Sequence, residues 1–297
     1  MVSRTKVAVV VDSAASLPVE MISSRSTGLF VVPMQLNIGN DVYLDGLDLT
    51  PSEFYTMQRL GKEVAKTSAP TPESFLTAFE AAAKVADHVL CLTVSAKFSS
   101  SYFSASSVIE DVRSIFPHTK FALVDTGSAA GGEGLVVTEA LRVSRIAKSW
   151  DQVLLSTNRV ICRISLFAYL DTLKYVSMGG RVPKMLYITT SILNIKPVME
   201  MSGGGIRTIG RVRGSTRATE SLIESIRRKI GGFPLHISIM HADVGDEAEK
   251  ICKRIRSEFD CVELYVSEFS PAMGAHTGPG LLALAYWEDY PDYGNQK

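Results

Sequence analysis

Hydroxyl side chains are concentrated at the ends of short apolar runs, and they are the chemically most suggestive feature of the sequence. Thr67 and Ser68 are adjacent, and further hydroxyls follow other apolar runs at Ser13, Ser95, Ser99, Ser100, Ser101, Thr126 and Ser128. A hydroxyl donates a hydrogen bond to an anion without adding a positive charge. The set therefore suits a site that holds a carboxylate and later releases it, although Ser and Thr are also common residues of turns and helix caps.

Two aspartates and one histidine are the other residues that could carry chemistry. Asp12 and Asp125 each follow an apolar run, where they could form a catalytic pair or bind a metal. The more common role of an Asp at such a position is to accept hydrogen bonds from nearby backbone N–H groups. His276 stands two residues before Gly278-Pro279-Gly280 and could donate to an anion, but a solvent-exposed loop histidine fits the sequence equally well.

Several sequence motifs of catalysis and nucleotide binding are absent. The chain has no G-x-S-x-G, no G-x-x-x-x-G-K-[ST], no G-x-G-x-x-G after a strand and no H-E-x-x-H. These absences argue against an ordinary α/β-hydrolase, a P-loop protein, a dinucleotide-binding domain and a zinc protease. We therefore expect no nucleotide bound by a familiar motif and no zinc site.

Composition indicates a globular protein of ordinary charge. The 297 residues are 46% hydrophobic and carry 31 Lys and Arg against 31 Asp and Glu, so a general basic surface for nucleic acid is not expected. The four cysteines form no C-x-x-C pair and are expected to be buried free thiols. The first apolar run, residues 7–11, is too short for a signal peptide or a membrane span. A cytoplasmic protein is expected.

The first half of the chain alternates between short apolar runs and helical patterns. Apolar runs occupy residues 7–11, 29–33, 89–94 and 121–124, and helices are predicted over 72–85, 102–115 and 135–148. This alternation predicts βαβ units and a parallel sheet, whose ligands bind at the carboxyl ends of the strands. Thr71 and Pro72 fit the N-cap and the first position of the first of these helices.

The second half has a different pattern and predicts an α+β arrangement with a mixed sheet. A helix is expected over 165–176, a hairpin of strands at 193–200 and 206–213, and a helix over 216–230. Strands at 235–243, 261–269 and 281–287 follow, with a helix over 246–258. The predicted organisation is therefore α/β with two domains, residues 1–157 with a parallel α/β/α sheet and residues 158–297 with a mixed α+β sheet.

Ten short segments, taken in order, resemble the DegV family of fatty-acid-binding proteins. They are DSAASL (12–17), PMQL (33–36), YLDGLDL (43–49), TSAPTPESF (67–75), SAKFSSSYFSA (95–105), DTGSAAGGEG (125–134), GGRV (179–182), LNIKPVM (193–199), GRVRG (210–214) and HTGPG (276–280). Each segment alone is a weak signal, but their order and spacing across almost the whole chain are specific.

The resemblance implies one long-chain fatty acid in a buried tunnel between two domains. It also implies that the protein does no catalysis alone and uses no cofactor and no metal. A separate, dihydroxyacetone-kinase-like kinase subunit would phosphorylate the presented carboxylate to an acyl phosphate for phospholipid synthesis, with transient contacts to a membrane or an acyltransferase. By position in the family motifs, the carboxylate-binding residues are Thr67, Ser68, Ser99, Ser100, Arg181 and His276. Arg211 and Arg213 correspond to a basic segment that would dock the kinase.

Two departures from the family pattern concern the head-group site. Ser100 and Ser101 stand where the family usually has Gly and Thr, and Ala69 replaces a Gln. The preferred chain length and the head-group geometry therefore stay open. Met34, Ile192 and Leu281 are candidates for the tunnel lining, although they are equally good core residues. An alternative function is a serine-dependent hydrolase or esterase that acts on a lipid-like substrate.

Overall fold

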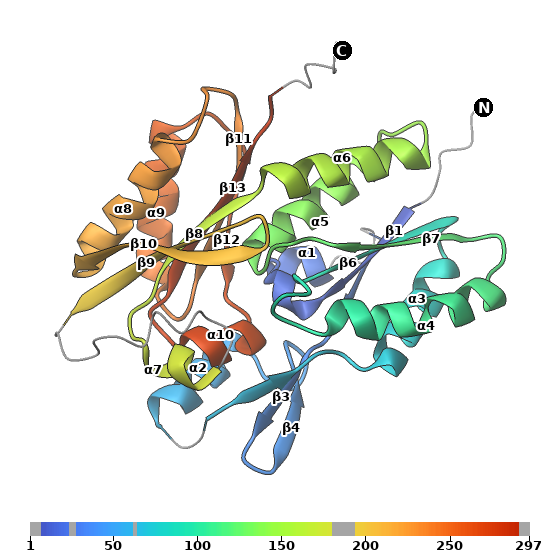
Figure 1. The fold of residues 1–297 in the computed structure, drawn as a ribbon, viewed down its shortest axis with the longest axis horizontal. Helices are drawn as coiled ribbons and strands as arrows, with labels where there is room; N and C mark the ends of the chain where they lie inside the picture. The colour runs from blue at the N-terminus through green and yellow to red at the C-terminus, as the bar shows by residue number, and fades with distance from the viewer. Residues whose placement is uncertain (1–6, 24–27, 62–63, 180–193, 291–297) are drawn as a thin grey trace.

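The computed structural model describes residues 7–23, 28–61, 64–179 and 194–290 (Figure 1). A parallel sheet with the strand order β2-β1-β6-β7 forms the first half. Its strands are β1 (Val7–Asp12), β2 (Leu29–Val32), β6 (His88–Thr93) and β7 (Lys120–Asp125). Alternate residues of β1 and β6 pack against α3 (Pro72–Ala83) and α4 (Ser101–Ile115) on one face and against α5 (Gly131–Ser144) on the other. Burial on both faces explains why these strands are continuous apolar runs.

A small antiparallel sheet extends from the parallel one. Its order is β4-β3-β5, with β3 (Gln35–Ile38), β4 (Asp41–Leu44) and β5 (Lys66–Ser68). Helix α2 (Pro51–Arg59) follows β4 and begins with a capping box between Thr50 and Glu53. Sequence analysis did not predict this sheet or α2. Thr67 and Ser68 lie in β5, which pairs with β3.

A six-stranded mixed sheet forms the second half, with the order β10-β9-β8-β13-β11-β12. Its strands are β8 (Ser165–Tyr169), β9 (Ile195–Ser202), β10 (Gly205–Arg213), β11 (Leu235–His241), β12 (Cys261–Glu268) and β13 (Leu282–Glu288). Only β11 and β12 pair in parallel. The remaining helices of this half include α8 (Ser215–Arg227), α9 (Gly245–Glu258) and α10 (Pro271–Thr277). The predicted α/β class with one parallel and one mixed sheet is confirmed.

Two local predictions are wrong. Residues 165–176 were expected to form one helix, but they form β8 and the start of α7 (Lys174–Gly179). All of Leu166 to Tyr169 is buried, so the apolar run reflects a central strand with two covered faces. The four cysteines are free as expected, but only Cys91 is buried and Cys162 is exposed. The domain boundary at residue 157 stays a prediction, and Thr157 lies within α6 (Trp150–Arg163).

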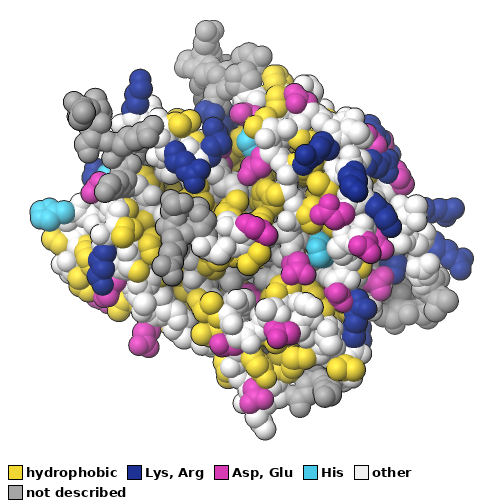
Figure 2. All heavy atoms as spheres, turned by 180° about the vertical axis from the view of Figure 1, so that it is seen from behind, with side chains coloured by type: hydrophobic (Ala, Val, Ile, Leu, Met, Phe, Trp, Pro, Cys, Tyr) yellow, Lys and Arg dark blue, Asp and Glu magenta, His cyan; other side chains and the backbone are white. Residues whose placement is uncertain are grey.

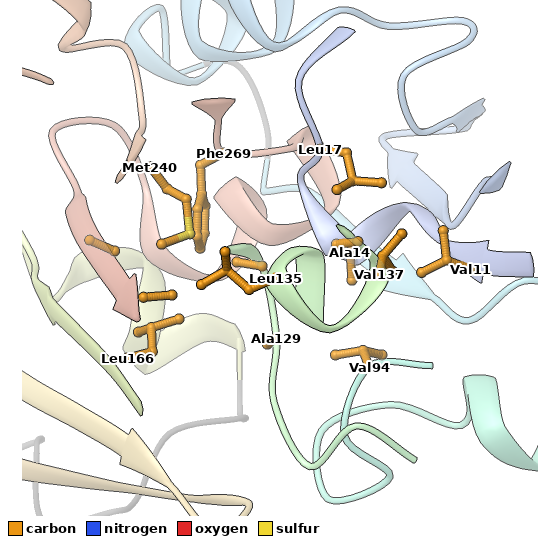
Figure 3. Close-up of a cluster of buried hydrophobic side chains, with 14 of the residues drawn as sticks. Val11, Ala14, Leu17, Val94, Ala129, Leu135, Val137, Leu166, Met240 and Phe269 are labelled. Carbon is orange, nitrogen blue, oxygen red and sulfur yellow. The ribbon is translucent and has the colours of Figure 1, made fainter. Parts of the chain in front are cut away.

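Helix α5 lies between the two large sheets and joins their cores. Nearly all of its residues are buried, and it contacts strands of both sheets. In Figure 3, Leu166, Met240 and Phe269 lie on one side of α5, with Val11 and Leu17 on the other. A Cβ at Gly131, where α5 begins, would collide with Ser238 and Met240, so only glycine fits this approach. The N-terminal end of α5 therefore sits close to the mixed sheet.

Candidate functional site

A cavity of about 370 Å³ lies where the three sheets meet. The ends of the parallel strands contribute Ala14, Val94 and Ala129, β5 contributes Thr67, and the mixed sheet closes the other side. Its described lining residues are Ala14, Met34, Thr67, Ser68, Ala69, Val94, Phe98, Ser99, Ser100, Ala129, Ala130, Leu166, Ala168, Val176, Met199, Met201, Ile206, Phe269, Ala272, Met273, His276, Thr277, Leu281 and Ala283. A volume of this size is typical of a small-molecule site.

The polar side chains of the cavity are hydroxyls and one imidazole. The Thr67 hydroxyl and Nε2 of His276 are 2.7 Å apart and share a hydrogen bond between β5 and α10. The Ser99 hydroxyl is 2.9 Å from that of Ser101 and accepts from the Ser101 backbone N–H. Ser99 and Ser100 directly precede α4, so the partial positive charge of that helix N-terminus lies beside them. This end can hold an anion through hydroxyls, an imidazole and a helix terminus.

The polar lining residues are more exposed than the apolar ones. Ser68 and Ser100 are exposed, and Thr67, Ser99 and His276 are half-buried. The lining residues from β8, β9 and β13 are buried and apolar. Among the described lining residues, His276 is the only titratable side chain. The cavity therefore joins a polar opening near the surface to a buried apolar interior.

The apolar interior is formed by every second residue of neighbouring strands. Leu166 and Ala168 of β8 and Met199 and Met201 of β9 face it, because successive side chains of a strand point to opposite faces. Alanines line much of the wall, including Ala14, Ala129, Ala168, Ala272 and Ala283, and their small side chains leave the space open. Ala130 has a φ of 50°, an unfavourable angle for a residue with a Cβ, and it also lines the cavity.

Five of the six residues predicted to bind a carboxylate line this one cavity. They are Thr67, Ser68, Ser99, Ser100 and His276, whereas Arg181 lies outside the described residues. Met34 and Leu281 also line it, and Ile192 lies outside the described residues. Arg211 and Arg213 are exposed on the edge strand β10 and do not line the cavity. The role of each residue in carboxylate binding or docking stays a prediction.

The two aspartates act as turn residues in the structure. The carboxylate of Asp12 accepts hydrogen bonds from the backbone N–H groups of Ala14 and Val94, each at 3.1 Å. Asp125 accepts from Gly127 and Ala96 in the same way. Burial raises the pKa of Asp12 to about 6. In the described part of the chain, no group of three or more His, Cys, Asp or Glu side chains is placed to hold a metal ion.

Sequence reasoning missed most of the apolar wall. Met199 and Met201 show the two-residue alternation that marks one face of a strand, and this signal was available in the predicted strand at 193–200. Leu166 and Ala168 could not be recognised as one face of a strand, because residues 165–176 were wrongly predicted to form a helix. Ile206 follows the hairpin turn and carries no sequence signal that separates it from an ordinary strand residue.

Two features of the described part of the chain concern membrane spans and surface charge. No helix in the described ranges combines the length and the apolar character needed to cross a bilayer. On the face seen in Figure 2, Lys and Arg side chains lie mainly toward the edges, with Asp and Glu among them. The described part of that face therefore has no continuous basic surface.

The fold and the site define a two-domain α/β protein with a largely apolar cavity that carries hydroxyls and one imidazole. The sequence matches the family described as "Uncharacterised protein, DegV family" over residues 6–289. A DegV domain-containing protein of Caldanaerobacter subterraneus is 30% identical over 95% of this chain and 99% of its own length. The chain belongs to the DegV family.

Solved structures of this family have the same fold. A DegV family protein from Thermus thermophilus, described by its fatty acid binding, is 28% identical with a TM-score of 0.85, over 96% of this chain and all of its own. A stearic acid-binding protein from Eubacterium ventriosum is 25% identical with a TM-score of 0.83, over 94% and 97% of the two chains. Neighbouring structures of the family thus bind fatty acids.

Proposed function

We propose that this protein binds one long-chain fatty acid in the cavity where the three sheets meet. The acyl chain lies against β8, β9 and β13, and the carboxylate lies among Thr67, Ser99 and His276. The observation that carries this proposal is the gradient from a polar, partly exposed end to a buried apolar interior without an Asp, Glu, Lys or Arg among its described lining residues. The fatty acids bound by structural neighbours give the same ligand class.

The acyl chain supplies most of the binding free energy. Each buried methylene contributes about 0.8 kcal/mol, so about fifteen of them contribute roughly 12 kcal/mol before entropy costs. A hydroxyl hydrogen bond contributes about 0.5–1.5 kcal/mol, and somewhat more when its acceptor is charged. The polar end therefore orients the head group without holding it tightly, which suits a carboxylate that another protein must reach.

The bound carboxylate is then phosphorylated by a separate, ATP-using kinase subunit, as the family resemblance implies. Two structural features support presentation of the head group. Ser68 and Ser100 are exposed at the polar end, so a partner can approach it from solvent. Arg211 and Arg213 are exposed on the edge strand β10, where a docking protein can contact them without entering the cavity.

Ligand extraction tests the binding step. Protein purified from a heterologous host, extracted with organic solvent and measured by mass spectrometry, is expected to release about one fatty acid per chain. Ala168→Phe places a ring in the cavity and should purify without an acyl chain, whereas Val262→Phe, at an exposed position on β12, should release as much as the parent. A clean extract from the parent, together with no uptake of added palmitate, would count decisively against the proposal.

An ester-hydrolysis assay tests the alternative of a serine hydrolase. In the structure Nε2 of His276 bonds to Thr67, and the Ser99 hydroxyl bonds to Ser101, so the bonds do not show a serine activated by that histidine. We expect no turnover of para-nitrophenyl butyrate above a heat-denatured control. Turnover that disappears in Ser99→Ala would favour the hydrolase instead.

A kinase assay tests the docking step. Arg211→Glu and Arg213→Glu should reduce ADP formation in a mixture of fatty-acid-loaded protein, kinase subunit and ATP, with unchanged fatty-acid affinity. Arg228→Glu, an exposed change on the α8 side of the molecule, serves as the charge-matched control. Equal rates for all four proteins would remove the docking role of β10.

A further inference from the structure

Methionine side chains are concentrated on the wall of the cavity where the three sheets meet. Four of the chain's ten methionines line it: Met34, Met199, Met201 and Met273. They come from three separate parts of the chain, namely the segment between β2 and β3, strand β9 and helix α10. Methionine is unbranched and has three rotatable bonds, so it changes shape readily and fills irregular gaps. This wall can therefore adapt to the outline of a bound chain.

The backbone that carries these methionines is fixed by hydrogen bonds. Strand β9 lies between β8 and β10 and pairs with both, so Met199 and Met201 belong to an interior strand of the six-stranded sheet. The N–H of Met34 donates to the Ser13 hydroxyl at 3.0 Å, and its carbonyl accepts from the Asp45 N–H at 2.9 Å. We therefore expect the outline of the cavity to change by rotation of side chains and not by movement of the strands.

The pairing of the strands places small side chains beside Met199. Ala168 of β8 pairs with Met199, and Ala283 of β13 pairs with Ala168, so one methionine and two alanines form a row across three strands. All three line the cavity, and the alanines leave space into which the Met199 side chain can turn. Met201 pairs with Leu166 in the neighbouring row, so the two adaptable side chains lie together along β9.

Met240 continues the same row but is constrained. It pairs with Ala283 on the other side and does not belong to the described lining of the cavity. Its Sδ accepts from the Gly131 N–H at 2.8 Å, and a Cβ at Gly131 would lie 2.6 Å from that sulfur. No hydrogen bond to the sulfur of Met199 occurs within the described ranges. Freedom to rotate is thus a property of the methionines that line the cavity.

We propose that the cavity binds straight and bent acyl chains of equal length with nearly equal affinity, because Met199 and Met201 turn aside for a bend. A cis double bond bends an acyl chain, and the bend needs width at one depth of the cavity. The row of Ala168 and Ala283 supplies that width, and Met199 fills it again around a straight chain. The ligands are therefore both saturated and cis-unsaturated fatty acids. This inference rests on the proposed fatty-acid function.

Titration of the full chain, freed of lipid, with three acids of equal length tests the proposal. They are palmitate, which is saturated, palmitoleate, which has one cis double bond, and palmitelaidate, its straighter trans isomer. The two isomers have the same composition, so the ratio of their dissociation constants reports the shape of the chain. We expect the cis and trans isomers to differ by no more than about threefold in the parent. A larger ratio overturns the proposal.

A double variant tests the role of the two methionines on β9. Met199→Leu/Met201→Leu replaces adaptable side chains by stiffer ones of nearly equal volume. Leucine is branched and has fewer rotatable bonds, so the affinity for the cis isomer should fall at least about fivefold relative to the trans isomer. Met57→Leu, on α2 and outside the described lining, is the matched control and should keep the parent ratio. A smaller change in the folded double variant, or an equal change in the control, overturns the proposal.

The outcomes separate this inference from the proposed function. Palmitate binding together with a large cis-to-trans ratio in the parent overturns the inference alone. No binding of any of the three acids overturns the proposed function and the inference with it. The parent ratio needs no variant, so it stays decisive if a thermal unfolding scan shows that the double variant does not fold. Met34→Leu, at another part of the wall, then takes its place and should raise the same ratio.

Discussion

The two cavities lie on either side of one wall and differ in charge. The first, the proposed fatty-acid site, has hydroxyls, one imidazole and no carboxylate among its described lining residues. The second, of about 630 Å³, has five carboxyl side chains, one imidazole and no Lys or Arg among its described lining residues. An anion is excluded from a space lined by carboxylates and accepted by one lined with hydroxyl donors. The two sides of the wall therefore differ in the charge of the ligand that they favour.

The wall itself is held by hydrogen bonds that connect residues of the two sides. The Ser13 hydroxyl, in the second cavity, accepts from the backbone N–H of Met34, whose side chain lines the first. Asp45 accepts from the N–H of Ala272 in the same manner. The backbone amides of first-cavity residues thus stabilise polar groups of the second. This arrangement separates two chemically opposite spaces with a single layer of chain.

The largest effect is expected from a substitution that fills the first cavity and leaves the second unchanged. Ala283→Phe places a ring among Leu281, Met199 and Ala168, where only the first cavity offers space. We expect fatty-acid affinity to fall by more than about a hundredfold, because the lost contacts with the acyl chain carry most of the binding energy. Isothermal titration with palmitate measures this.

The control for this substitution is a measurement of folding. A thermal unfolding scan should show that Ala283→Phe folds. Undiminished palmitate binding in the folded variant would mean that the acyl chain lies elsewhere.

The next largest effect is the pH dependence that the buried carboxyl group of Asp45 gives to the free energy of unfolding. The folded-state pKa of Asp45 is about 6 against an ordinary value of 3.8, mainly because of burial. A raised carboxyl pKa means that the folded state binds the proton first, so its contribution to stability rises as pH falls through about 6 and levels off near 4. The free energy of unfolding of the parent minus that of Asp45→Asn should therefore rise by about 2–3 kcal/mol from pH 7 to pH 4.

Urea unfolding at several pH values measures this difference, and Asp111→Asn is the control because it lies outside both cavities. The other carboxylates, including Glu53 and Glu200 with lowered pKa values, are common to all the proteins and cancel in the difference. Parallel pH profiles for the parent and Asp45→Asn would show that Asp45 ionises in the folded protein as it does in the unfolded chain.

A smaller effect is expected at the polar end of the first cavity. Thr67→Ala removes the hydroxyl bonded to His276, and Ser99→Ala removes the hydroxyl beside the N-terminus of α4. Each should weaken palmitate binding only about two- to tenfold, because a hydroxyl bond contributes about 0.5–1.5 kcal/mol. Ser107→Ala, an exposed hydroxyl on α4, is the matched control. Complete loss of binding in either folded variant would show that the head group, and not the acyl chain, dominates affinity.

The sequence predicts the parallel half well because each strand there is a continuous apolar run that ends in a polar cluster. Thr71 is the N-cap of α3 as predicted, and its hydroxyl accepts from the Ser74 N–H. Thr67, Ser68, Ser99 and Ser100 line one cavity. Their positions in the family motifs predicted that they would lie together.

Two features could not be predicted from local sequence. Residues 166–169 are all apolar, a pattern that fits a buried strand or a buried helix equally well, and the six-stranded sheet decides between them. The second cavity draws its carboxylates from Asp12 to Glu268, so no short segment reveals it. Methionine and alanine in the first cavity are also ordinary core residues, and only the folded chain shows the space between them.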